Sequence, residues 1–209
     1  CDTVEGKQQQ YDALLLQISI STSVSLPTLI ISQFLGFKEA NVYAVYNLVI
    51  NAMISIISAL SSGVSPMLGR SIAQGKNIGG AYNVYDYIVS YVITVFFATT
   101  TVMILPFIQL YTNVVDDINY IHSSYALLIC IWAAAYSYRI PVTAVVNAAA
   151  IYTKNRVSNI VNLVMQIVLG VIGTRILGIP GLLIVMIAAA IQRNISLSIN
   201  NDKELLHCG

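Results

Sequence analysis

Residues 125–151 read YALLICIWAAAYSYRIPVTAVVNAAAI, an almost wholly apolar run that carries Arg139 near its middle. As an α-helix the run would extend roughly 40 Å at about 1.5 Å per residue, which is enough to cross a bilayer with tilt. A charge at that depth is costly unless it faces protein or a wet cavity, so Arg139 is a candidate functional residue. Pro141 removes a backbone donor and disfavours helical geometry at Ile140. The run therefore predicts one transmembrane helix with a kink just beyond the charge.

One face of this predicted helix is polar and aromatic. Helical steps of three, four and eight residues bring together Trp132, Tyr136, Arg139, Thr143 and Asn147. The opposite face carries only aliphatic side chains. Such a helix is typical of the wall of a cavity.

The composition indicates an integral membrane protein. The chain is 57% hydrophobic and 9% charged, whereas soluble domains carry about 25% charged residues. A net charge of +1 without a basic run gives no indication of nucleic acid as a partner. Cys1, Cys130 and Cys208 form no disulfide or metal framework, and no motif calls for a cofactor. The first residues are hydrophilic and lack an initiator Met, so we expect the sequence to be a piece of a longer chain.

Six apolar segments divide the chain. A polar segment (1–13) precedes them, a polar tail (200–209) follows, and both ends are expected in the cytoplasm. The predicted transmembrane helices are residues 14–35, 42–62, 87–110, 125–151, 160–172 and 182–199. A short turn, GFKEAN, separates the first two.

Several of these segments carry internal features. In the second span Asn51 belongs to a polar stripe, which serves either as glue between helices or as a cavity lining. Asp86 lies at the start of the third span. In the fifth span Gly170 and Gly173 predict a close helix contact.

Basic residues support this topology through the positive-inside rule. When loops are assigned alternately to the two sides, Lys38 and Arg175 fall on one side and Arg139 falls between. The other side receives Lys7, Arg70, Lys76, Lys154, Arg156, Arg193 and Lys203. The side with seven basic residues is predicted to be cytoplasmic.

Several stretches, taken in order, resemble a known family. They are FLGFKEANVYAVYNLVINAMISIISALSSGVSPMLGRSIAQGK, NVYDYIVSYVITVFFATTTVMILPFIQLYT, DDINYI and YRIPVTAVVNAAAIYTKNR. They look like the second half of a polysaccharide-export flippase, from the superfamily that also holds the multidrug and toxin extrusion (MATE) transporters and the lipid II flippases. The likeness covers most of residues 34–157.

The resemblance implies an all-α membrane fold of two six-helix lobes around a central cavity, of which this chain is the second lobe. The first lobe is then a missing partner. The implied substrate is an undecaprenyl-diphosphate-linked oligosaccharide, moved to the outer leaflet of the bacterial cytoplasmic membrane for capsule or O-antigen synthesis. On this hypothesis Arg139 contacts the diphosphate, because a guanidinium keeps its charge when desolvated. The sugar-facing wall is then formed by Tyr136, Asn147, Asn51 and Trp132.

Alternatives remain open at this point. Arg139 could instead pair with another residue or with backbone carbonyls to fix the Pro141 kink. Asp86 could titrate in an ion-coupled cycle or partner Arg139, or it could be a helix N-terminal charge favoured by the dipole. For the whole protein, the alternatives are a MATE-like cation-coupled exporter of small organic molecules and a membrane-embedded polysaccharide polymerase or ligase. We expect a transporter rather than an enzyme.

Overall fold

The computed structural model describes residues 14, 21–22, 24–64, 66–67, 70–71, 74, 79–112, 120–143 and 155–205. Every regular element within these residues is an α-helix, so the predicted all-α class is confirmed. A short apolar helix spans Val24–Phe34. The labelled helices are α2 (Phe37–Ser62), α4 (Gly79–Thr112), α5 (Ser123–Ser137), α7 (Asn155–Leu177) and α8 (Ile179–Leu205).

Three helical stretches are long and apolar enough to cross a membrane, namely Phe37–Ser62, Tyr82–Thr112 and Ser123–Thr143. The remaining apolar helices are shorter, and they are Val24–Phe34, Val161–Leu177 and Ile179–Ile195. Membrane-protein character is therefore supported by three helices, and a lobe of six spans stays a prediction.

The outer surface of α4 is apolar, as expected for a helix that contacts lipid. Large apolar side chains lie exposed along its length, and Tyr87 and Leu110 are 80% and 78% exposed. Monomeric soluble proteins rarely expose a continuous apolar patch of more than a few hundred Å². Lipid chains would cover such a surface at no cost in hydration.

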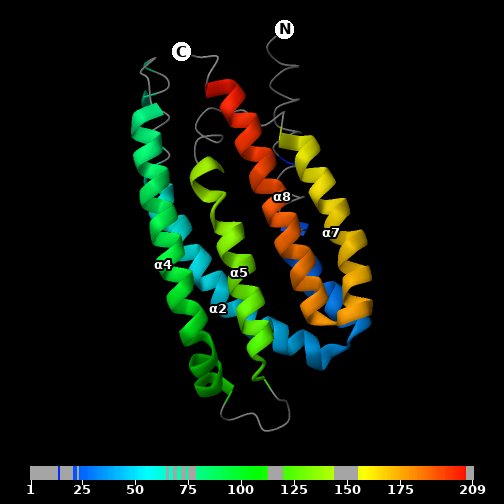
Figure 1. The fold of residues 1–209 in the computed structure, drawn as a ribbon. Helices are drawn as coiled ribbons and strands as arrows, with labels where there is room; N and C mark the ends of the chain where they lie inside the picture. Colours follow the sequence, from blue (N-terminus) through cyan, green and yellow to red (C-terminus); the bar gives the residue numbers. More distant parts are fainter. Residues whose placement is uncertain are drawn as a thin grey trace.

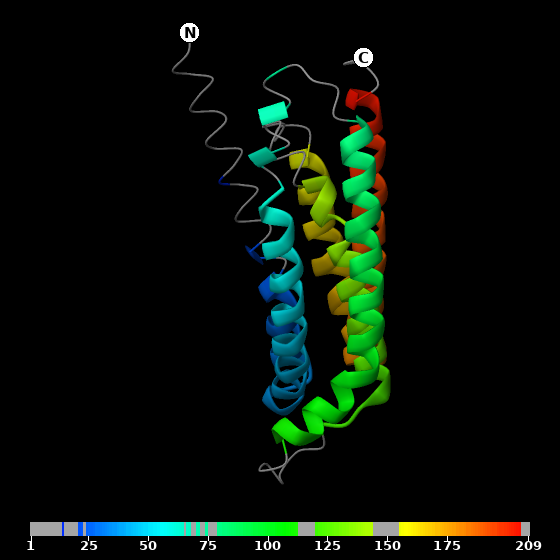
Figure 2. The same ribbon diagram turned by 90° about the vertical axis from the view of Figure 1, so that its left-hand side faces the viewer.

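Consecutive helices run in alternating directions along the bundle. Figures 1 and 2 show α2, α5 and α8 rising toward the upper end, whereas α4 and α7 descend. Lys38 and Arg175 therefore lie at the lower end, where α2 begins and α7 ends. Arg156 and Lys203 lie in the first turn of α7 and near the end of α8, at the upper end.

Two glycines make the tight turns at the lower end. Gly36 and Gly178 have φ angles of 93° and 69°, a region that side chains with a Cβ rarely adopt. The next helix starts directly after each glycine, at Phe37 and Ile179. The expected turn GFKEAN is thus wrong beyond Gly36, because the residues after it form the first turns of α2.

The helices α7 and α8 form the closest pair in the bundle. A Cβ added to Gly173 would lie 2.9 Å from the carbonyl oxygen of Gly181, which is closer than real Cβ contacts come. A Cβ added to Gly170 would lie 3.1 Å from the Leu182 side chain. The close helix contact predicted at Gly170 and Gly173 is confirmed, and its partner is the Gly181 backbone.

A buried tyrosine joins α2 to the start of α5. The Tyr46 hydroxyl donates to the carbonyl oxygen of Tyr120 at 2.8 Å and accepts from the His122 amide at 3.1 Å. Tyr46 is 1% exposed, and these bonds satisfy the buried carbonyl of Tyr120 and the partly buried amide of His122. They fix the lower end of α5 and with it the height of the residues above.

Candidate functional site

The helix α5 ends two residues before the predicted cavity residue, Arg139. The α-helix stops at Ser137, Tyr138 and Arg139 form a turn, and helical geometry returns from Ile140 to Thr143. Pro141 explains the break, since it has no N–H to donate to the Ser137 carbonyl. The prediction was one transmembrane helix over 125–151 with a kink just beyond the charge, and its described part lies within Ser123–Thr143, one apolar stretch interrupted by this turn. The break falls at the charge itself rather than beyond it.

Three helices bring polar side chains to the same height as this break. Heights along the bundle follow from a rise of roughly 1.5 Å per residue, counted from the lower end of each helix. Arg139 lies about 24 Å above the start of α5, Arg193 about 21 Å above the start of α8, and Asn162 about 22 Å above the end of α7. Helical steps of three or four align the neighbours of each on one face. These are Trp132 and Tyr136 on α5, Gln166 on α7, and Ala190 and Asn194 on α8.

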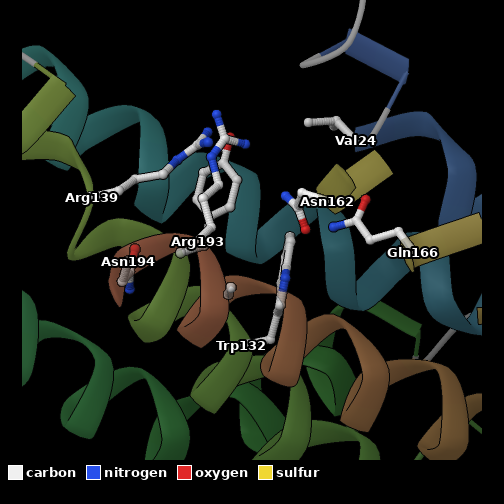
Figure 3. A pocket seen from close by; sticks show the side chains of 9 residues that line it. Val24, Trp132, Arg139, Asn162, Gln166, Arg193 and Asn194 are labelled. Carbon is white, nitrogen blue, oxygen red and sulfur yellow. The ribbon is translucent and has the colours of Figure 1, made fainter. Parts of the chain in front are cut away.

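These side chains line one pocket inside the bundle, closed on a further side by Val24. Figure 3 shows the side chains of Arg139 and Arg193 converging on the same space, with Asn162 and Gln166 on another side of it and the Trp132 ring next to Asn162. The space left between the side chains is about 20 Å³. That volume holds about one water molecule, so a larger ligand must widen the pocket as it enters.

Aromatic and backbone contacts hold the arginine side of the pocket in place. The Arg139 guanidinium lies 3.8 Å from the centre of the Tyr136 ring, a distance that gives an attractive cation–π contact. The Tyr136 and Trp132 rings lie 5.5 Å apart, tilted by 42°. Asn194 donates to the Ala135 carbonyl at 2.7 Å, which ties α8 to α5 just below the break.

The charge of the pocket is wholly positive. Among the described residues no carboxylate lines it, and its two arginines repel each other. Arg193 is only 9% exposed, so water screens that repulsion poorly. An anion placed between the guanidinium groups would replace the repulsion with two charge-assisted contacts.

Three of the residues that line the pocket carry polar atoms without a hydrogen-bond partner among the described residues. Within the described part of the chain, the Arg193 Nε donor and the Asn162 Oδ1 and Gln166 Oε1 acceptors have no hydrogen-bond partner. Asn162 is only 3% exposed. Leaving a buried polar group unpaired costs about 1–3 kcal/mol, so these atoms favour a ligand that offers them hydrogen-bond partners.

The structure brings together three of the six residues predicted from the sequence. Arg139, Tyr136 and Trp132 line the pocket. Asn51 is exposed on α2 and does not line it, and Asn147 lies outside the described residues. The role of these two in sugar contact stays a prediction.

Asp86 also lies apart from the pocket. It is half-buried in α4, seven residues beyond the start of that helix at Gly79, so it is not an N-terminal helix charge. It does not line the pocket that holds Arg139. An ion-coupling role for Asp86 stays a prediction.

Sequence reasoning missed the contribution of α7 and α8. Arg193 was assigned to a loop in the positive-inside distribution, and this is wrong because it is buried within α8. With Arg139 and Arg193 both at the pocket inside the bundle, the bias becomes six basic residues against two, and its direction is unchanged. The signal was present in the sequence, since Asn162, Gln166 and Arg193 are polar residues within apolar segments.

No protein-family model, curated protein or solved structure matches this chain. The family resemblance therefore stays a prediction, and the pocket is the observation on which a function is argued.

Proposed function

We propose that this chain is one six-helix lobe of a transporter that moves undecaprenyl-diphosphate-linked oligosaccharide across the bacterial cytoplasmic membrane. The observation that carries the proposal is the pair of arginines in one pocket, without a carboxylate among the described lining residues. A lipid-linked sugar meets its largest barrier at the diphosphate, whose charge is penalised in hydrocarbon. Two guanidinium groups offset this cost, because their planar forks match phosphate oxygens and keep their charge when desolvated.

The height of the pocket fits such a path. A hydrocarbon core of about 30 Å contains the level at which the two arginines lie, nearer to the upper end of the bundle. By the positive-inside rule the upper end is the cytoplasmic one. The pocket would then receive the diphosphate soon after it leaves the cytoplasmic leaflet.

The broken helix supports a role in transport rather than a passive one. Discontinuous helices commonly form substrate sites in secondary transporters, near the middle of the membrane. The turn at Tyr138 and Arg139 contains the charge that would contact the substrate. An exporter of organic cations is less well supported, since its site would need carboxylates where this pocket has arginines.

The proposal is tested in cells whose complete transporter carries Arg139→Gln, Arg193→Gln or both. We expect surface polysaccharide to fall about tenfold or more while lipid-linked oligosaccharide accumulates in the cytoplasmic leaflet, because each variant loses a charge-assisted contact of about 1.5–3 kcal/mol. Arg175→Gln is the matched control, since Arg175 is exposed at the lower end and its cation–π contact is with Phe34. Normal export by the double variant, at wild-type protein levels in the membrane, would refute the proposal.

A further inference from the structure

Two amide side chains remain unexplained by a diphosphate. Asn162 and Gln166 lie one helical turn apart on α7 and line the same pocket as the arginines. Their unpartnered atoms in the described structure are the carbonyl oxygens Oδ1 and Oε1. Both oxygens are acceptors and need a donor.

A diphosphate does not supply that donor. Its oxygens are ionised at neutral pH and accept hydrogen bonds, so they suit the free Arg193 Nε and not the amide oxygens. The pocket therefore has two kinds of groups that lack partners among the described residues. The arginines on the α5 and α8 side need an anionic acceptor, and the amide oxygens on the α7 side need a neutral donor. A ligand that satisfies both must carry hydroxyl or N–H groups next to its phosphates.

We propose that Asn162 and Gln166 form a subsite for the sugar attached directly to the diphosphate, an inference that rests on the proposed function. Hydroxyl groups of that sugar donate to Asn162 Oδ1 and Gln166 Oε1. Trp132, which is 6% exposed and lies next to Asn162 in the pocket, offers an aromatic surface to the apolar face of the sugar ring. The subsite binds the first sugar selectively, whereas the arginines bind the diphosphate independently of the sugar that it carries.

The test uses two probes, undecaprenyl diphosphate and undecaprenyl-diphosphate-N-acetylglucosamine, with the full chain in lipid nanodiscs. Trp132 is the only tryptophan in the chain, so its fluorescence reports occupancy of the pocket directly. We expect wild type to bind the sugar-bearing probe three- to tenfold more tightly than the sugar-free one. Asn162→Leu and Gln166→Met are each expected to reduce this preference to below twofold, chiefly by weakening the binding of the sugar-bearing probe.

Two further variants separate the possible causes of a change. Gln192→Leu is the matched control, because Gln192 also has an unpartnered buried oxygen on α8 but does not line the pocket, so its preference should equal that of wild type. Arg193→Gln should weaken the binding of both probes alike. If Asn162→Leu does not fold, as judged by circular dichroism, Gln166→Met decides the question.

Each outcome has one meaning. Equal binding of the two probes by wild type, with both dependent on Arg193, would overturn the sugar subsite and leave the proposed function standing. A preference that survives in both amide variants would also overturn the subsite. No arginine-dependent binding of either probe would refute the proposed function, and the subsite would fall with it.

Discussion

A methyl group at Gly181 is the sharpest available test of the helix packing beneath the pocket. A Cβ at this position would lie 2.8 Å from the Gly173 carbonyl carbon, closer still to its oxygen, and 2.9 Å from the Leu177 Cβ. The obstacles are mainly backbone atoms, so a change of rotamer does not relieve them. A carbon rests about 3.3–3.6 Å from a carbonyl oxygen, and α7 and α8 must therefore separate by about 1 Å. Overpacking of this kind costs about 1–3 kcal/mol, so Gly181→Ala should destabilise the fold by that amount.

The assay is reversible unfolding in mixed detergent micelles, followed by circular dichroism and by the fluorescence of Trp132. Gly80→Ala is the matched control, because Gly80 lies within α4 and a Cβ there would meet nothing within 4 Å. That substitution removes a flexible residue from a helix and should stabilise the protein by about 0.5–1 kcal/mol. The two glycine variants should thus change stability in opposite directions. If Gly181→Ala is as stable as Gly80→Ala, the close contact between α7 and α8 is refuted.

One further substitution and one added ligand are expected to change the free energy of unfolding. Tyr46→Phe removes a hydroxyl that pairs one buried and one partly buried backbone group, and it should cost about 1–3 kcal/mol of unfolding free energy. Tyr43→Phe, on the same buried helix face, is the control and should cost less than about 1 kcal/mol. Equal costs would contradict the role of Tyr46. Inorganic pyrophosphate at about 100 times its Kd should stabilise wild type by about 2.7 kcal/mol through binding, at an ionic strength matched with chloride. Arg139→Gln should lose most of this stabilisation, and its retention would contradict an anion site at the arginines.

Much of the fold follows from hydropathy and from glycine placement. Each apolar segment contains an apolar helix, because a backbone in an apolar environment must satisfy its own hydrogen bonds. The helix limits were harder to predict than the helices themselves. The hydropathy pattern predicted that the second span begins at residue 42, whereas α2 begins at Phe37. The charged residues Lys38 and Glu39 lower the local hydropathy, and the first five residues of the helix were therefore not predicted.

The break at Arg139 was predicted in kind and misplaced by about two residues. Proline was expected to bend the chain after the charge, where its own ring lies. The missing hydrogen bond of Pro141 is instead the one that the Ser137 carbonyl would accept, one turn earlier, and the turn forms at Tyr138 and Arg139. The prediction that Asn147 shares a face with Arg139 assumed regular helical geometry across this break.

The candidate site was half predictable, for a reason that lies in long-range packing. The stripe of Trp132, Tyr136 and Arg139 follows from the period of one helix. Arg193 lies two residues from the end of the apolar stretch Ile179–Ile195, so by hydropathy it resembles a charge at a membrane boundary. Only the packing of α8 against α5, together with the continuation of α8 to Leu205, shows that it lies inside the bundle.

That packing also explains why the pocket favours a functional interpretation over a structural one. Two arginines in one poorly hydrated space oppose folding, and the described residues offer Arg139 the ring of Tyr136 and no carboxylate. If Arg139 only fixed the Pro141 kink, a single partner for one charge would suffice, and a second arginine from α8 would add repulsion without benefit. Local rules are most often broken where a protein binds or reacts. A ligand with several negative charges reverses the sign of this interaction, so that both arginines contribute to binding instead of opposing folding.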